Sequence, residues 1–237
     1  MKSFFTVQNK ILVLLLFCFA TSYKAQNLAG ITGLYYIPTA RVNSDGQFDF
    51  GASYFAKKAI DYSNINRNVY VIYSKIGYLS FLEVAVRLTA VYDSYEPNHS
   101  ADRMISFKIR LLNENYYLPV VSVGMQSLFA TDNEARLFNS TYIVLTKSFQ
   151  TNTIIKNVEL TLGYGIDIIK SRDYDYIGLF GGISLSPWNW SEIMLEFDAE
   201  RWNGGVRVTL LEHIKVLAGL IEYKYFSGGV SVSWNLL

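Results

Sequence analysis

The sequence predicts an all-β fold, an antiparallel transmembrane β-barrel of about 12 strands of the outer-membrane type. Three observations predict it. The chain begins with an export-signal pattern, continues in segments of about ten residues in which apolar and polar side chains alternate, and contains 16% aromatic residues, including 18 Tyr. Alternation with a period of two is typical of strands with two different faces, and aromatic girdles mark the interfaces of membrane barrels.

Residues 1–25 have the pattern of a signal peptide. Lys2 and Lys10 precede an uncharged run, residues 11–23, that is rich in Leu, Phe and Val. This run is too short for a membrane-spanning helix, which needs about 20 residues. We expect cleavage after Ala25, with an uncleaved anchor as the alternative.

Cleavage there would leave residues 26–237 as one barrel domain without a cysteine. Cys18 follows the bulky Phe17, where a lipidated cysteine normally follows a small residue, so we do not expect a lipoprotein. Neither a disulfide framework nor a thiolate metal site is then available. Removing the three signal-peptide lysines from the 21 basic residues leaves 18 against 20 acidic ones, a balance that excludes a nucleic-acid partner.

Three segments show the alternation most clearly, residues 82–92, 104–111 and 158–167. In the first, one face carries Leu82, Val84, Val86, Leu88, Ala90 and Tyr92, and the other carries Glu83, Ala85, Arg87 and Thr89. Weaker segments bring the expected count to about 12. Polar, turn-prone stretches are predicted to separate the strands: residues 61–67, 93–102, 112–115, 131–136, 151–153, 171–175 and 203–205.

The second face of the strands distinguishes a membrane barrel from a secreted soluble β-protein. A soluble barrel exposes a face dense in charged and polar side chains, whereas here that face is sparse in them. It carries serine, isolated charges and a series of glycines: Gly51, Gly124, Gly163, Gly165, Gly205, Gly219 and Gly229. This pattern favours a crowded polar lumen and an apolar surface in contact with lipid.

Several motifs, taken in order, resemble one family. Residues 30–41 read GITGLYYIPTAR and precede Asp45 and Gly46; residues 110–114 and 118–124, then 179–183 and 195–198, follow at the expected spacing. This order is similar to that of the YjbH family of outer-membrane exopolysaccharide-biosynthesis proteins, which includes a related group-4-capsule protein. The chain departs from the pattern at residues 126–130 and is short beside members with a second barrel.

The resemblance implies an outer-membrane protein of a Gram-negative bacterium that assists exopolysaccharide or capsule production or export. It implies no catalytic residue, so we expect neither an enzyme nor a cofactor. The expected partners are outer-membrane lipid, the barrel-assembly machinery, polysaccharide and other export-system proteins. A passive porin-like channel and an outer-membrane barrel hydrolase are the alternatives.

Arg41 and Asp45 flank the first motif, in which Gly30 and Gly33 permit tight turns and Pro38 restricts φ. One hypothesis makes residues 30–45 a plug or periplasmic lip that touches glycan or a partner. The other makes them a structural clamp closing the barrel floor, with Arg41 in an ion pair with a nearby acid such as Asp45.

Charged residues on the second face are expected to line the lumen: Glu83, Arg87, Lys108, Arg110, Glu159, Asp167, Glu196, Asp198 and Arg207. Their mixed signs indicate ion pairs that fill and stiffen a narrow barrel, because a buried charge needs a partner. A polar path for sugar hydroxyls or ions is the alternative.

Glu196 and Asp198 stand two residues apart on one strand face, a spacing that could also pair carboxylates for glycoside cleavage. Pairs of this kind are common on polar faces, so the signal is weak. His99 and His213, the two histidines, have no recognisable nucleophile nearby and are not expected to bind a metal.

Overall fold

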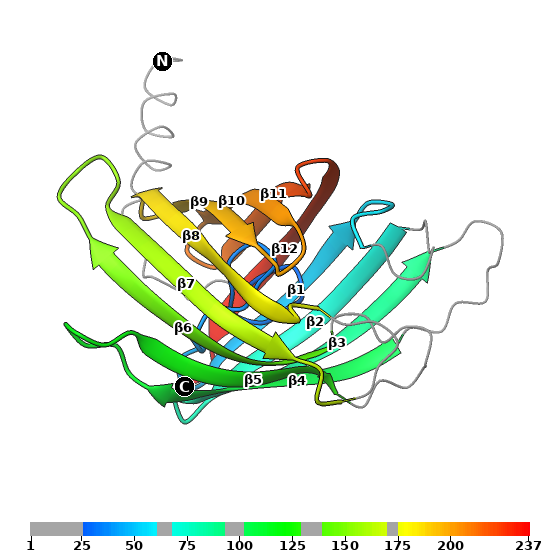
Figure 1. Cartoon of the computed structure of the whole chain (residues 1–237), viewed down its shortest axis with the longest axis horizontal. Coiled ribbons are helices and arrows are strands. Elements are labelled where there is room, and N and C mark those ends of the chain that lie inside the picture. Colours follow the sequence, from blue (N-terminus) through cyan, green and yellow to red (C-terminus); the bar gives the residue numbers. More distant parts are fainter. Residues whose placement is uncertain (1–25, 61–67, 93–101, 129–138, 170–174) are drawn as a thin grey trace, which may run out of the picture.

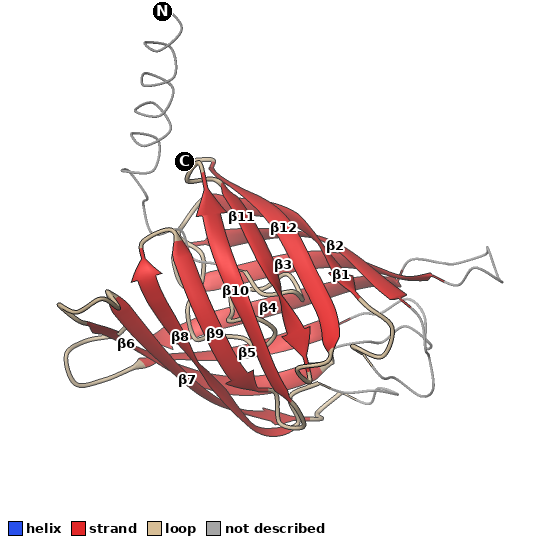
Figure 2. Cartoon of the chain, turned by 90° about the horizontal axis from the view of Figure 1, so that it is seen from above, coloured by secondary structure: helices blue, strands red, loops and turns tan. Residues whose placement is uncertain are grey.

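The computed structural model describes residues 26–60, 68–92, 102–128, 139–169 and 175–237, which form a closed antiparallel barrel (Figures 1 and 2). The predicted fold class and the expected number of strands are confirmed. The strands are β1 (Gln47–Phe55), β2 (Asn68–Tyr78), β3 (Leu82–Tyr92), β4 (Asp102–Leu112), β5 (Val120–Leu128), β6 (Ser140–Gln150), β7 (Asn157–Ile166), β8 (Gly178–Trp188), β9 (Ser191–Phe197), β10 (Trp202–Leu210), β11 (Ile214–Ile221) and β12 (Tyr225–Asn235).

Each strand pairs with its neighbours in sequence, and β1 closes the barrel by pairing with β12. Phe50 therefore lies opposite Ser74 on one side and Val232 on the other. Closure removes the unpaired edge that hydrocarbon could not satisfy. Within the described ranges, no helix is long and apolar enough to cross a bilayer.

The outer face of the barrel is apolar, as the alternation predicts. On β7, Leu162 and Tyr164 point outward and are 53% and 54% exposed, whereas the intervening Gly163 is buried. The same reversal holds on β3, where Val86 is exposed and Glu83 and Arg87 are buried. Large apolar side chains around a closed barrel with charges inside are the arrangement of a membrane barrel in lipid.

The two ends of the barrel differ in their connections. At the end where β1 begins and β12 ends, the connections are short, residues 79–81, 113–119, 151–156, 189–190 and 211–213. At the other end, four connections are longer, residues 56–67, 93–101, 129–139 and 167–177. Short turns face the periplasm in outer-membrane barrels, so we assign the short-turn end to that side.

One predicted separator is wrong. Residues 203–205 lie inside β10, and the turn that precedes this strand is formed by residues 198–201. Asn-Gly-Gly reads as a turn by composition, but here Asn203 faces the lumen and donates a hydrogen bond from Nδ2 to Asp198 (2.9 Å). Gly205 leaves room for the ring of Tyr35, which occupies the space a Cβ would need.

Aromatic rings inside the lumen pack directly against glycines of the barrel wall. A Cβ on Gly51, Gly124 or Gly163 would overlap Tyr73, Tyr142 or Phe180 respectively. The aromatic excess was expected at the membrane interfaces, but buried rings also fill the barrel interior. The glycine-rich face is therefore apolar in part as well as polar.

We predict that Gly163→Ala destabilises the barrel because its methyl group would overlap the tip of the Phe180 ring. Overpacking of this kind costs about 1–3 kcal/mol. Adding Phe180→Leu, which removes the ring tip, should restore part of the loss. Thermal unfolding in detergent measures both. Gly204→Ala is the matched control, because a Cβ at this position would lie 3.2 Å from the edge of the half-exposed Tyr223 ring. An equal loss of stability in Gly204→Ala would contradict the proposed packing of Phe180 against Gly163.

Candidate functional site

Residues 26–43, here called the plug, form a folded loop inside the barrel. In Figure 1 the plug is the blue segment that winds behind the front strands. Its turns are closed by backbone hydrogen bonds from Leu28 N to Tyr35 O (3.0 Å) and from Leu34 N to Ile37 O (3.0 Å). A Cβ at Gly33 would overlap the carbonyl oxygen of Ile37, so the motif glycine permits a close backbone approach. Residues 30–43 therefore lie inside the barrel, where the plug hypothesis placed residues 30–45.

The Glu83 carboxylate of β3 holds two separate parts of the plug. Its Oε1 accepts a hydrogen bond from Thr32 N (2.8 Å), and its Oε2 accepts one from Asn43 N (3.0 Å). The Thr32 hydroxyl also donates to Oε2. One buried side chain thus satisfies backbone donors that are eleven residues apart in the plug.

Two buried lysines surround the same carboxylate. Lys108 Nζ lies 3.4 Å from Glu83 Oε1 and donates to Thr32 O (2.7 Å). Lys75 Nζ lies 3.8 Å from Glu83 Oε2 and 3.2 Å from Asp49 Oδ2, and it donates to Thr32 Oγ1 (2.8 Å). Glu83 thus forms ion pairs inside the lumen, and Thr32 of the plug is hydrogen-bonded to all three charged side chains.

Glu196 of β9 forms a second seat for the plug. Its carboxylate accepts hydrogen bonds from three consecutive backbone N–H groups, those of Tyr35 (3.1 Å), Tyr36 (2.8 Å) and Ile37 (3.3 Å). Asp198 instead accepts bonds from Glu200 N (3.1 Å), Arg201 N (2.7 Å) and Asn203 Nδ2 (2.9 Å) at the β9–β10 turn. Both carboxylates of the sequence pair therefore have structural partners.

Arginines of the barrel wall bind plug carbonyl groups. Arg207 Nη2 donates to Gln26 O (3.1 Å), Gly33 O (2.9 Å) and Leu34 O (2.6 Å), while its Nη1 pairs with Glu192. Arg87 Nη1 donates to Ala29 O (3.2 Å). Carboxylates of the wall thus hold plug N–H groups, and guanidinium groups hold plug carbonyls.

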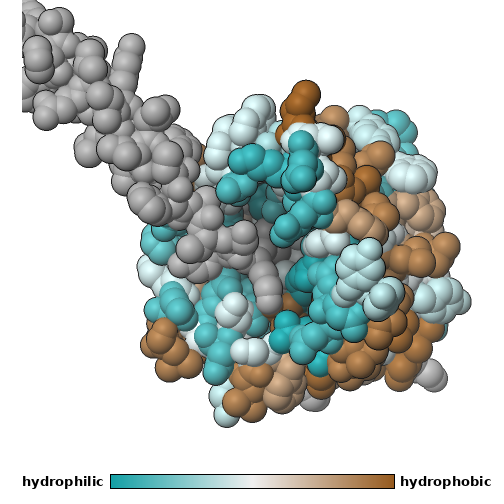
Figure 3. All heavy atoms as spheres, turned by 90° about the vertical axis from the view of Figure 1, so that its left-hand side faces the viewer, coloured by the Kyte–Doolittle hydropathy of each residue, from teal (hydrophilic) through white to brown (hydrophobic). Residues whose placement is uncertain are grey.

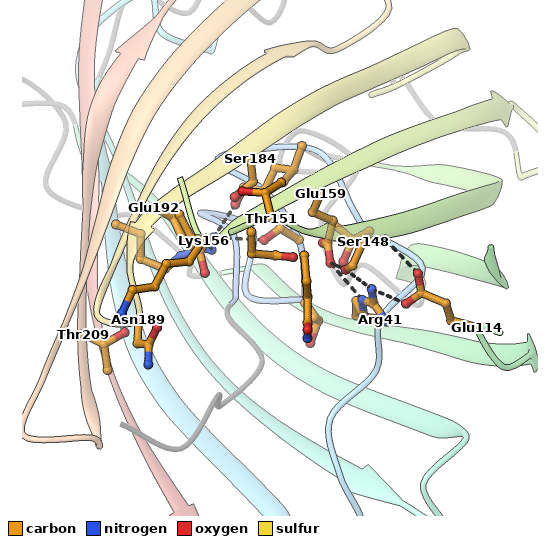
Figure 4. A pocket seen from close by; sticks show the side chains of 18 of the residues that line it. Arg41, Glu114, Ser148, Thr151, Lys156, Glu159, Ser184, Asn189, Glu192 and Thr209 are labelled. Atoms are coloured by element: carbon orange, nitrogen blue, oxygen red, sulfur yellow. Dashed lines mark hydrogen bonds and ion pairs between the residues drawn. The ribbon is translucent and has the colours of Figure 1, made fainter. Parts of the chain in front are cut away.

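Arg41, near the end of the plug, pairs with acidic residues of the β4–β5 turn and of β7. Its Nε donates to Glu159 Oε2 (2.9 Å) and its Nη2 to Glu114 Oε2 (2.7 Å), and Ser148 is a third partner (Figure 4). The expected pairing of Arg41 with Asp45 is wrong. Asp45 is exposed at the short-turn end, where its Oδ1 accepts from Leu79 N (2.8 Å), because the chain has already left the lumen there.

The Glu114 carboxyl gives a pH dependence to this contact. Burial would raise its pKa, but the hydrogen bond from Ser148 N and the guanidinium of Arg41 outweigh burial and hold the pKa below its usual range. A lowered pKa in the folded state stabilises the protein above the unfolded-state pKa, and this stabilisation is lost as the pH falls through the folded-state value.

We therefore predict that Glu114→Gln lowers the thermal unfolding midpoint at pH 7 and that the difference from wild type shrinks as the pH falls from about 4.5 downward. Unfolding curves in detergent between pH 7 and pH 3 measure this. A difference that stays constant over that range would mean that the Glu114 charge does not support the fold.

Two of the predicted lumen residues, Arg110 and Asp167, lie away from the plug. Arg110 is partly exposed and donates to Ser80 O at the β2–β3 turn, at the rim rather than inside the lumen. Asp167 is exposed just beyond β7. His213 lies in the β10–β11 turn, and His99 lies outside the described residues. In the described part of the chain, no group of His, Cys, Asp and Glu could hold a metal ion.

A cavity of about 710 Å³, here called the vestibule, lies between the plug and one wall of the barrel. Plug residues such as Thr32 and Thr39 line it, together with the ends of β6 to β10 and their turns. Figure 3 views the short-turn end, where hydrophilic residues gather toward the middle of the face and many hydrophobic ones lie around its margin. The lumen is thus filled on one side and hollow on the other.

Several residues of the site were not singled out from the sequence: Asp49, Lys75, Glu114, Glu192 and Lys156. Asp49 and Lys75 occupy the polar face of their strands, so the alternation could have identified them. Glu114 and Lys156 are turn residues, outside any periodic pattern. Glu114 belongs to the site because Arg41 of the plug pairs with it.

The chain was compared with known proteins. The search of curated proteins found no match. Among solved structures, the outer-membrane protein Omp33 of Acinetobacter baumannii aligns with a TM-score of 0.45 and 9% identity, over 81% of this chain and 99% of that one. The model of the YjbH family, described as exopolysaccharide biosynthesis protein, matches residues 25–175, which comprise the plug and β1 to β7. This chain, an outer-membrane β-barrel with its N-terminal motif inside the lumen, belongs to the YjbH family.

Proposed function

We propose that this protein is a non-catalytic outer-membrane component of exopolysaccharide or capsule production or export. The observation that carries the proposal is its membership of a family described by exopolysaccharide biosynthesis, over a match that begins at the plug. The plug motif is therefore part of what the family shares, and in this chain wall residues such as Glu83 and Glu196 hold it.

The occupied lumen supports an accessory role over that of a passive channel. The plug is buried and crosses the space through which ions would pass in a porin-like barrel. The carboxylates that could suit hydrolysis, Glu196 and Asp198, accept hydrogen bonds from the plug backbone and from a turn. A hydrolase would need at least one of them to face substrate.

Export through a cleaved signal peptide is part of the proposal. The uncharged run at residues 11–23 and the position of Ala25 support it. Residues 1–25 lie outside the described residues. The barrel-assembly machinery would then insert residues 26–237 into the outer membrane. The intact mass of the protein extracted from outer membranes should equal that of residues 26–237.

Deletion of the gene tests the function. We expect less exopolysaccharide or capsule at the cell surface, restored by the wild-type gene, when cell-bound and released polysaccharide are measured separately. A build-up of polymer inside the envelope would place the protein in export, and a fall in total polymer would place it in production. Unchanged amount, composition and distribution would contradict the proposal.

A further inference from the structure

We propose that the vestibule binds a short segment of a polyhydroxylated glycan that enters from the short-turn end, and that Lys156 favours segments carrying a carboxylate. This inference deepens the proposed function and rests on it. It gives a ligand class to the cavity that remains beside the plug.

The size of the vestibule suits such a ligand. Its volume of about 710 Å³ falls within the usual range for small-molecule sites, about 300–1,000 Å³. It is lined by residues of the short turns, including Glu114, Asn152 and Asn189, so it opens at the end assigned to the periplasm. A polymer on that side of the membrane would meet it first.

The lining is polar to an unusual degree. Every lining residue except Gly33 and Leu34 carries a polar side chain, and none is aromatic. Most ligand sites are predominantly apolar, so this cavity does not suit a lipid tail or an aromatic compound. Hydroxyl and amide side chains, such as those of Ser186, Thr209 and Asn189, both donate and accept hydrogen bonds, as sugar hydroxyls do.

The charges of the wall leave one cation for a ligand. Arg41 is engaged by Glu114 and Glu159, and Arg207 is engaged by Glu192 and the plug carbonyls. The Lys156 ammonium, by contrast, has neither an ion pair nor a hydrogen bond within the described part of the chain. Lys156 is exposed, and Figure 4 shows it on the same side of the cavity as Asn189 and Thr209.

The position of the plug adds a mechanical consequence. Thr32, Gly33, Leu34 and Thr39 contribute to the lining, so a glycan segment in the vestibule would touch the plug directly. Thr32 is also the residue held by Glu83 and both buried lysines. Ligand binding and plug seating would then share residues.

Calorimetry on the purified full-length protein in detergent tests the inference, with two probes of equal length: a neutral hexasaccharide, maltohexaose, and an acidic one, hexagalacturonate. Without an aromatic stacking surface we expect a Kd on the order of 1 mM for the neutral probe. The acidic probe should bind about two- to five-fold more tightly, the effect of one exposed ion pair, and this preference should weaken with added salt.

Two variants and matched controls make the test specific. Ser186→Trp fills the vestibule and should abolish binding of both probes, whereas Thr153→Trp, in the β6–β7 turn outside the lining, should leave it unchanged. Lys156→Gln should remove only the preference for the acidic probe. Lys57→Gln, an exposed lysine at the opposite end, should retain it.

The outcomes separate this inference from the proposed function. If neither probe binds, or if Ser186→Trp binds both as wild type does, the vestibule is not a glycan site. Loss of surface polysaccharide on gene deletion would still support the proposed function in that case. If the deletion changes nothing while the probes bind as expected, the glycan site is supported and the cellular role is not.

Discussion

Replacing Glu196 with alanine is expected to release the plug from the barrel wall. The substitution removes the acceptor for the N–H groups of Tyr35, Tyr36 and Ile37 while leaving all three buried. Each buried donor left without a partner costs roughly 1–3 kcal/mol, so the plug loses a large share of its hold on β9. Arg207 and Glu83 would still hold other parts, which favours local release over unfolding of the barrel.

Single-channel recording in planar bilayers measures the release. Wild-type protein should show little conductance because the plug crosses the lumen, and Glu196→Ala should show openings. Trypsin provides a second measurement, since the bond after Arg41 should become cleavable once the plug leaves the lumen.

The matched variants show whether the hydrogen bonds are the cause. Glu196→Gln keeps one acceptor oxygen and should behave between wild type and Glu196→Ala. Glu200→Ala removes an exposed acid four residues away in the following turn and should remain closed. A Glu196→Ala protein that neither conducts nor becomes cleavable at Arg41 would show that this carboxylate does not hold the plug.

The barrel could be predicted because alternation reports directly on the two faces of a strand. Glu83, Arg87, Lys108, Glu196 and Arg207 were placed in the lumen from their position on the polar face, and all five are buried there. Their charges also required partners, which the structure provides. Period-two patterning could supply this much without any knowledge of the loops.

The partners themselves could not be predicted. Glu196 and Arg207 bind the plug backbone, whose N–H and carbonyl groups carry no signal in the side-chain pattern. The path of an irregular loop depends on close backbone contacts such as that between Gly33 and the carbonyl oxygen of Ile37. The ion pairs of Arg41 with Glu114 and Glu159 could therefore not be predicted from the sequence. Asp45 is close to Arg41 in sequence and therefore suggested an ion pair. The sequence does not show that the chain leaves the lumen between these two residues.

Replacing Glu83 with alanine is expected to have the largest effect on assembly. It removes the acceptor shared by Thr32 and Asn43 and takes the negative charge from beside Lys75 and Lys108. Breaking a buried ion pair from one side costs about 3–5 kcal/mol, because a buried charge loses its compensation. Asp49 still lies 3.2 Å from the Lys75 ammonium, whereas the Lys108 ammonium loses the Glu83 carboxylate that lies 3.4 Å from it.

The fraction of folded barrel in outer membranes, read from the mobility difference between heated and unheated samples in electrophoresis, should therefore fall strongly for Glu83→Ala. The double variant Glu83→Gln with Lys108→Met removes both charges, keeps similar volumes and retains an acceptor for the plug. It should recover much of the folded fraction, because an uncharged pair leaves no buried ion uncompensated. Asp167→Ala, the loss of an exposed acid beyond β7, should assemble as wild type does. If Glu83→Ala assembled equally well, the carboxylate would contribute little to the fold, and the plug would depend on Glu196 and Arg207 instead.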